Sequence, residues 1–199
     1  MLKFIYGVMG SSKSAQALIT QYNYRQNSFN VIILKPSTDT RDPGVLRSRI
    51  GLEAPCITFK NNDNLKAIIY NYAMDNKMIL DDPTIIIVDE AQFCTKEQIE
   101  QLKDISLSVD VFCYGLLTNF KTELFSGSKR LIELSDNLEK IDHVCKCGKQ
   151  ALINAKFCNG IIVTEGEEIQ IGDIEYEPMC YKCYIQELQR KDHKEFLEN

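Results

Sequence analysis

Short apolar runs alternate with helix-like segments over the first two thirds of this chain, and that alternation restricts the folds open to it. The apolar runs have the length and β-branched composition of buried strands and cover 2–6, 31–34, 84–88 and 109–114. Between and after them, the sequence predicts helices over 14–26, 62–78, 95–103 and 127–136. Apolar residues recur at spacings of three and four in 62–78, and a Thr-x-x-Gln capping box of Thr95 and Gln98 opens 95–103. Strands joined through helices in this way form parallel sheets with right-handed crossovers. We therefore predict an α/β fold with a parallel sheet flanked by helices.

The composition is that of a globular protein and argues against several kinds of partner. Of the 199 residues, 44% are hydrophobic and 26% are charged, which excludes a disordered or fibrous chain. Lys and Arg total 23 against 28 Asp and Glu, so the net charge of −5 offers no polycationic surface for nucleic acid. No apolar run approaches the roughly 18–20 residues that span a bilayer, and the N-terminus does not read as a secretory signal. We expect a soluble, cytoplasmic protein that binds neither nucleic acid nor membrane.

Residues 7–14, with the sequence GVMGSSKS, lie between the first predicted strand and the first predicted helix. They fit the phosphate-binding pattern G-x-x-x-x-G-K-[ST], except that Ser12 stands at the second glycine. Such a loop points its backbone N–H groups at a phosphate beside a helix N-terminus. In this interpretation Lys13 neutralises β/γ-phosphate charge and Ser14 is a ligand of Mg²⁺. Taken alone, the segment could also be a polar turn before a helix.

An acidic pair follows the strongest predicted strand. Asp89 and Glu90 come directly after the apolar run 84–88, so they lie at the carboxyl end of a parallel strand, where open α/β sheets bind ligands. Asp89 can hold Mg²⁺ through water, and Glu90 can act as a general base. A lone acidic pair after a strand more often caps a helix. Its combination with the loop, however, predicts nucleotide binding.

Four of the eight cysteines form two close pairs, Cys145 with Cys147 and Cys180 with Cys183. In a reducing compartment such pairs more often hold a metal than form disulfides. They predict a closed Cys₄ zinc site with a structural role, for which His143 and Cys158 are competing ligands. We therefore divide the chain into a nucleotide-binding domain over 1–140 and a zinc-binding domain over 141–199 that ends in a helix.

Three further segments carry a resemblance to a known family. They are 35–41 (KPSTDTR), 89–93 (DEAQF) and 114–120 (YGLLTNF). Together with the phosphate loop and the cysteine pairs, they resemble the type II thymidine kinases, and the Cys-x-Cys first pair is similar to that of the bacterial branch. The resemblance covers about residues 4–184.

The resemblance implies a P-loop (RecA-like) sheet with a small C-terminal zinc-binding lasso. It implies transfer of the γ-phosphate of ATP to the 5′-hydroxyl of thymidine or deoxyuridine in nucleotide salvage, with Glu90 as the catalytic base. The residues implied to serve ATP and Mg²⁺ are Gly7, Val8, Met9, Gly10, Ser11, Ser12, Lys13, Ser14, Asp39, Arg41, Asp89 and Gln92. A homotetramer and feedback inhibition by dTTP are implied as well.

The residues implied to bind the nucleoside surround its base. Phe120 would pack against thymine, with Met9, Leu116 and Phe125 as neighbours. A lasso loop between the two cysteine pairs would close the pocket through backbone hydrogen bonds. The residues implied for this closure are Ile169, Gln170, Ile171, Gly172 and Tyr176.

Two departures from the family pattern carry expectations of their own. Ser12 replaces a glycine, and because L-residues are costly at positive φ, we predict a negative φ for it. The segment 171–176 (IGDIEY) lacks the family's double glycine and one residue, so we expect a tighter lasso.

Two other functions stay open. A P-loop ATPase with a zinc ribbon acting on nucleic acid would use the same loop and cysteines, although the acidic net charge disfavours it. A catalytically degenerate nucleotide-binding sensor would keep ATP binding while its loop is disabled at Ser12.

Overall fold

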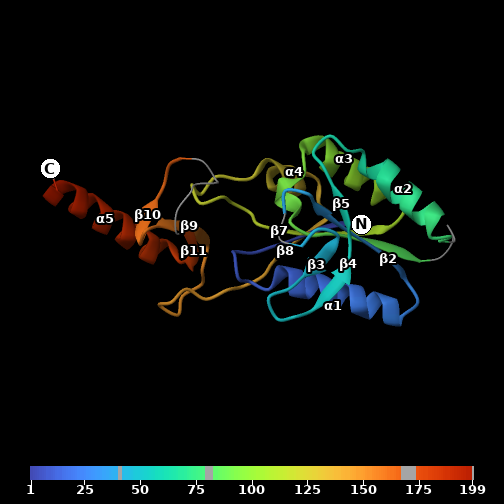
Figure 1. Ribbon diagram of the computed structural model, residues 1–199, viewed down its shortest axis with the longest axis horizontal. Helices are drawn as coiled ribbons and strands as arrows, with labels where there is room; N and C mark the ends of the chain where they lie inside the picture. Colours follow the sequence, from blue (N-terminus) through green and yellow to red (C-terminus); the bar gives the residue numbers. More distant parts are fainter. Residues whose placement is uncertain (40–41, 79–82, 167–173, 199) are drawn as a thin grey trace. The chain divides into compact units, whose positions relative to one another are not determined.

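The computed structural model describes residues 1–39, 42–78, 83–166 and 174–198 (Figure 1). The chain forms two compact units. The sheet unit comprises Met1–Tyr6, Ser12–Leu117 and Phe125–Lys140. The cysteine unit comprises Gly7–Ser11, Thr118–Leu124 and the residues from Ile141 onward. Two short segments that the sequence assigns to the first domain therefore belong to the unit that carries the cysteine pairs.

A six-stranded parallel sheet forms the centre of the sheet unit. Its strands are β1 (Leu2–Tyr6), β2 (Asn30–Pro36), β5 (Ile57–Phe59), β6 (Thr84–Val88), β7 (Asp110–Gly115) and β8 (Asn137–Lys140). They lie in the order β5-β2-β6-β7-β1-β8, and every neighbouring pair is parallel. The predicted parallel sheet is confirmed, and the four predicted strands are its four central ones. The edge strands β5 and β8 were not predicted because they are short and partly exposed and so form no apolar run.

Helices cover both faces of this sheet (Figure 1). On one face α1 (Lys13–Gln26) packs against β2, β6 and β7. On the other, α3 (Lys96–Ile105) packs against β7 and α4 (Ser126–Leu134) against β1, while α2 (Leu65–Asp75) packs against α3. α3 begins with a capping box, in which the Thr95 side chain accepts from the Gln98 N–H and the Gln98 side chain accepts from the Thr95 N–H. α2 begins later than predicted because Asn64 caps its start by accepting from the Ala67 N–H.

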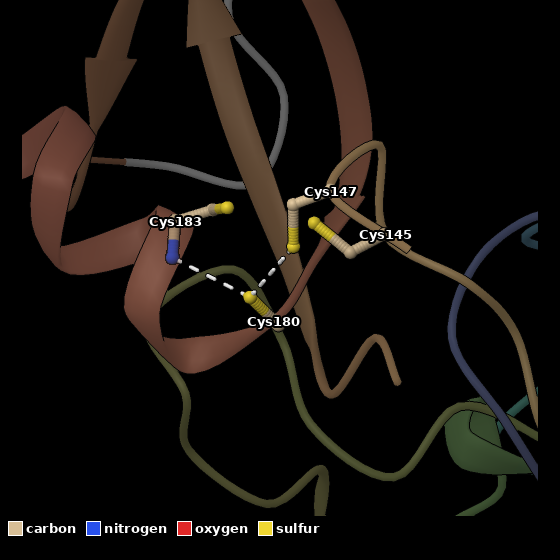
Figure 2. Close-up of side chains that lie close together, drawn as sticks. All are labelled: Cys145, Cys147, Cys180 and Cys183. Carbon is tan, nitrogen blue, oxygen red and sulfur yellow. Dashed lines mark hydrogen bonds between the residues drawn. The ribbon is translucent and has the colours of Figure 1, made fainter. Parts of the chain in front are cut away.

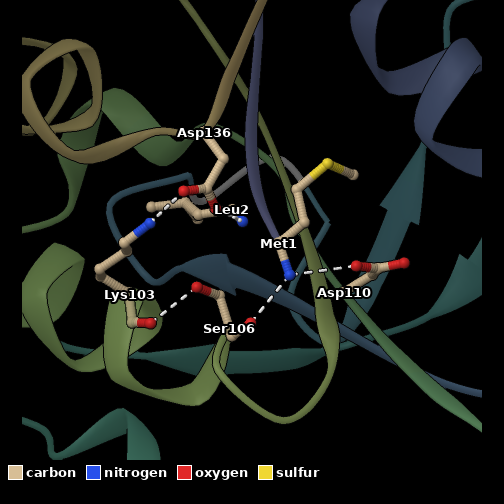
Figure 3. A network of polar contacts seen from close by, with 6 residues as sticks. All are labelled: Met1, Leu2, Lys103, Ser106, Asp110 and Asp136. Carbon is tan, nitrogen blue, oxygen red and sulfur yellow. Dashed lines mark hydrogen bonds and ion pairs between the residues drawn. The ribbon is translucent and has the colours of Figure 1, made fainter.

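The amino end of β1 is fixed by a polar network in the sheet unit (Figure 3). The Met1 amine lies 3.1 Å from Asp110 Oδ1 and donates to the Ser106 carbonyl at 2.8 Å. Asp136 Oδ2 accepts from the Leu2 N–H at 2.7 Å, and its other oxygen accepts from Lys103 Nζ. Asp136 therefore joins the start of β1 to the end of α3.

The cysteine unit contains a small antiparallel sheet. In it β9 (Ile153–Cys158) lies between β10 (Ile161–Val163) and β11 (Ile174–Met179). The C-terminal helix that we predicted is α5 (Tyr181–Glu198), and a two-stranded hairpin of β3 (Val45–Arg47) and β4 (Glu53–Pro55) belongs to the sheet unit. Within the described residues, no helix is long and apolar enough to cross a membrane.

Candidate functional site

Asp89 lies at the carboxyl end of β6, next to the first turn of α1. The Ser14 hydroxyl donates to Asp89 Oδ2 at 2.7 Å, and the Asp89 side chain is 2% exposed. Burial, with Glu90 beside it, raises the pKa of the Asp89 carboxyl to about 7, while the Ser14 hydrogen bond and Lys13 oppose the shift. A cation at this point would relieve the repulsion between the two neighbouring acidic groups. A hydroxyl and a carboxylate oxygen at hydrogen-bond distance are also the donor types that Mg²⁺ prefers, so these residues fit that ion.

Glu90 is held by Gln92 within the sheet unit. Gln92 Nε2 donates to Glu90 Oε2 at 2.6 Å, and Gln92 Oε1 accepts from the Leu116 N–H at 3.0 Å. Glu90 itself has a left-handed backbone with a φ of 51°, which is uncommon for an L-residue. Gly115 leaves room for the Gln92 side chain, because a Cβ at position 115 would lie 2.7 Å from Gln92 Oε1. The carboxylate is therefore oriented through an amide that also binds the end of β7.

The phosphate-loop segment connects β1 to α1, and Ser12 does not have the negative φ that we predicted. Its φ is 63° and its ψ is 24°, which is left-handed, and its side chain makes no capping hydrogen bond. Gly10, two residues earlier, has a φ of 79°, and the Ser11 N–H donates to the Val8 carbonyl. The prediction was wrong because the tight turn into α1 requires a left-handed residue whichever side chain stands there.

A buried ion pair lies at the carboxyl end of β2, the strand next to β6. Lys35 is 1% exposed and its Nζ is 3.3 Å from Asp39 Oδ2. Sequence reasoning named Asp39 and missed Lys35, although a lysine at the end of an apolar strand is itself a signal, because a buried ammonium requires a partner. Cys56 lies near this ion pair. Burial raises the pKa of its thiol to about 11, while the positive charge of Lys35 opposes the shift and the negative charge of Asp39 adds to it. The expected phosphate ligand Arg41 lies outside the described residues.

The residues implied to contact the nucleoside fall into two groups. Phe120, Met9 and Tyr176 belong to the cysteine unit. Leu116 and Phe125 belong to the sheet unit, where the Phe125 ring packs edge-on against Phe93 at 5.7 Å between centroids. The implied lasso contacts Ile169, Gln170, Ile171 and Gly172 lie outside the described residues.

Sequence reasoning missed two buried polar residues of β9, Asn154 and Lys156. Asn154 Oδ1 accepts from the Met9 N–H at 2.7 Å, and its Nδ2 donates to the Thr118 carbonyl at 3.3 Å. Lys156 Nζ lies 4.5 Å from the centre of the Phe120 ring. No motif marks either residue, because their partners are more than 30 positions away in the sequence.

The four paired cysteines come together in the cysteine unit (Figure 2). The sulfur atoms of Cys145, Cys147, Cys180 and Cys183 all lie within 4.8 Å of one another, and neither His143 nor Cys158 belongs to this cluster among the described residues. The Cys183 N–H donates to the Cys180 sulfur at 3.5 Å. Backbone N–H groups of Cys147 and Cys180 lower the pKa of the Cys145 thiol to about 7, whereas hydrogen bonds with the Cys147 and Cys180 side chains raise the pKa of Cys183 to about 12. The case for a metal therefore rests on the convergence of the four sulfur atoms. Four convergent sulfur atoms fit a structural Zn²⁺ ion.

A parallel sheet with a segment close to the phosphate-loop pattern before its first helix, and an acidic pair at the end of β6, is the arrangement of nucleotide-binding α/β proteins. A family model described as thymidine kinase matches residues 1–184. The chain belongs to the thymidine kinase family, a family of ATP-dependent phosphotransferases.

Individual relatives agree with this assignment. The thymidine kinase of Rhodopirellula baltica is 37% identical over 90% of this chain and 85% of its own length. Those of Shewanella oneidensis and of phage T4 are 37% and 40% identical, covering 92% and 91% of this chain and 95% and 93% of their own. Among solved structures, an ATPase domain matches 88% of this chain and 79% of its own with a TM-score of 0.48 and 14% identity, too distant to bear on fold or activity.

Proposed function

We propose that this protein transfers the γ-phosphate of ATP to the 5′-hydroxyl of thymidine, or of deoxyuridine, in nucleotide salvage, giving dTMP from thymidine. Membership of the thymidine kinase family supports the reaction. The observation that carries the proposal is the acidic pair at the end of β6, in which Asp89 contacts Ser14 of the loop and Glu90 is oriented by Gln92.

On the ATP side, the residues of the 7–14 loop would bind the phosphates. Lys13 would neutralise phosphate charge, and Asp39, held by buried Lys35, would lie near the same groups together with Arg41. Ser14 and Asp89 would hold Mg²⁺, whose charge stabilises the negative charge that spreads over the transferring phosphoryl group.

On the nucleoside side, Glu90 would accept the proton of the 5′-hydroxyl as the oxygen attacks the γ-phosphorus. A positioned base of this kind contributes about 10²–10⁴-fold to rate. The Gln92 amide supports this role, because it fixes the carboxylate orientation with a 2.6 Å hydrogen bond. Gln92 would therefore position the general base Glu90, and the nucleotide contact implied by the resemblance stays a prediction.

The nucleoside base would pack against Phe120, with Met9, Leu116 and Phe125 around it. The lasso, through 169–172 and Tyr176, would close over it. In this proposal, the domain over 1–140 carries the ATP-binding residues together with Phe120 and its neighbours, and the domain over 141–199 carries the lasso. The lasso starts after Cys147 and ends before Cys180. Zinc held by the four cysteines would therefore hold its two ends together.

Assembly, regulation and location remain predictions from the resemblance and the composition. We infer a homotetramer inhibited by dTTP. The two close cysteine pairs have the spacing of metal ligands, which favours a reducing, cytoplasmic environment. The nucleic-acid ATPase is disfavoured by the net charge of −5. The sensor alternative gains one supporting observation, the left-handed Ser12, although Lys13, Ser14, Asp89 and Glu90 are all retained.

A single assay separates these functions. The purified protein is incubated with Mg-ATP and with radiolabelled thymidine, deoxycytidine or deoxyadenosine, and the monophosphates are resolved. We expect label in dTMP and neither of the others. ATP hydrolysis with salt-sensitive DNA binding and no dTMP would support the ATPase, and ATP binding without turnover on any nucleoside would support the sensor.

A further inference from the structure

Lys156 is a lysine in the interior of a strand, and its side chain is completely buried. It lies on β9 in the cysteine unit with an exposed fraction of 0%. Its Nζ is 4.5 Å from the centre of the Phe120 ring, which is 2% exposed. An ammonium over an aromatic face is attracted by the ring quadrupole, and the attraction is strongest where water is excluded. The Phe120 ring is therefore held on one face by a buried cation.

Asn154 fixes the same chain segment from the same face of β9. Residues two apart on a strand point to the same side, so the Asn154 and Lys156 side chains lie together. Asn154 donates to the Thr118 carbonyl and accepts from the Met9 N–H. The segment that carries Phe120 is thus attached to β9 at two points, through its backbone at Thr118 and through its ring at Phe120.

The register of the small sheet brings Tyr176 to the same place. Lys156 on β9 is directly opposite Tyr176 on β11, and directly opposed residues in an antiparallel pair have side chains on one face. Lys156 therefore shares one face of the sheet with Tyr176 while contacting Phe120, and both aromatics are residues that the resemblance assigns to the nucleoside.

We propose that Lys156 is a positioning residue for the nucleoside site: its buried ammonium fixes the Phe120 ring in the orientation that packs against the base. The inference rests on the proposed function for the role of Phe120. It predicts that loss of the cation weakens thymidine binding more than it affects the use of ATP.

The chain offers a matched control in Lys121. This lysine is also near the Phe120 ring, with Nζ 5.7 Å from its centre, but it is exposed and lies at the outer limit of such contacts. Removing its charge should have little effect, because water screens the ammonium.

Steady-state kinetics of Lys156→Met, Lys156→Arg and Lys121→Met form the first test. Methionine keeps the unbranched apolar stem and removes the charge. We expect KM for thymidine to rise about ten-fold in Lys156→Met with KM for ATP within about two-fold. Arginine, which retains the cation, should restore most of the loss, and Lys121→Met should match the parent. A folded, zinc-replete Lys156→Met with the parent's KM for thymidine would overturn the proposal.

A second test leaves Lys156 in place, and its first readout, the melting temperature, needs no substrate. Mono-, di- and trifluorophenylalanine are incorporated at position 120, which reduces the charge on the ring face stepwise while nearly keeping its shape. The melting temperature of the protein alone should fall with each fluorine, and KM for thymidine should rise in parallel. A flat series would overturn the contact, even if Lys156→Met does not fold. A stepwise series in a protein that never phosphorylates thymidine would retain the contact and refute the proposed function instead.

Discussion

Replacing Ser12 by glycine tests whether the phosphate loop is strained by its own side chain. Ser12 has a φ of 63° and makes no capping hydrogen bond, so its hydroxyl does not provide the benefit that serine usually brings to a helix start. An L-residue in the left-handed region costs about 1–2 kcal/mol relative to glycine. Glycine in turn adds about 0.5–1 kcal/mol of backbone freedom to the unfolded chain.

The difference between these two effects gives the expected magnitude. Ser12→Gly should increase the free energy of unfolding by about 0.5–1 kcal/mol. For a chain of this size, 1 kcal/mol corresponds to a shift of about 2–4 °C in melting temperature. Scanning calorimetry of the purified protein resolves a change of this size.

Ser28 provides the matched control for this measurement. It is also a serine in the left-handed region, with a φ of 64°, and it follows the C-terminus of α1 rather than preceding its start. Ser28→Gly should raise the melting temperature by a similar amount. A melting temperature that falls in Ser12→Gly while it rises in Ser28→Gly would refute the reasoning, because the Ser12 side chain would then stabilise the loop. Inert wild-type protein with an active Ser12→Gly variant would support the sensor.

Three further predictions concern the general base Glu90, the zinc site and the pH-dependent contact of Asp136. Glu90→Gln should reduce kcat for thymidine about 10²–10⁴-fold while ATP binding, measured by calorimetry, persists; an unchanged kcat would remove Glu90 from the mechanism. Cys180→Ser should lose the one zinc per chain expected by metal analysis and weaken thymidine binding, whereas zinc-free parent protein would contradict the assignment. The hydrogen bond from Lys103, and to a smaller extent the one from the Leu2 N–H, lowers the pKa of the Asp136 carboxyl. The stability that Asp136 contributes to the folded protein is therefore fully present above the ordinary pKa of 3.8, and it is lost as the pH falls through the lowered pKa of the folded state. Asp136→Asn should therefore have a lower free energy of unfolding than the parent at neutral pH in denaturant titrations. The difference between the two proteins should disappear at strongly acid pH, and a difference that widens there would contradict the assignment.

The parts of the fold that the sequence predicts are those whose signal is local. β1, β2, β6 and β7 are buried on both faces and read as continuous apolar runs, and the Thr95 capping box is complete within four residues. The strands of the cysteine unit were missed because β10 has only three residues, while β9 and β11 mix apolar with polar residues and form no continuous apolar run.

Among the site residues, the ones found from sequence stand in motifs, and the ones missed act through distant partners. Asp89 and Glu90 follow a strand directly, and the cysteine pairs have ligand spacing. Asn154 and Lys156 depend on the contact of β9 with segments 118–120 and 9, which no local pattern encodes. The predicted negative φ of Ser12 was wrong for a different reason. The phosphate-loop pattern describes a preferred residue type, whereas the turn into α1 fixes the backbone conformation whichever residue is present.

The hydrogen bonds of the Gln92 side chain fix which end of its carboxamide faces Glu90. The Leu116 N–H can only donate, so the end of the carboxamide facing it must be the oxygen. The amino end is consequently turned toward Glu90, and it can be met there only by an acceptor. The Gln92 carboxamide can therefore bridge these two groups in one orientation only: it accepts from the main-chain N–H at the end of β7 and donates to the carboxylate at the end of β6. Glutamate, which has the same shape as glutamine but two oxygens, would satisfy Leu116 and repel Glu90.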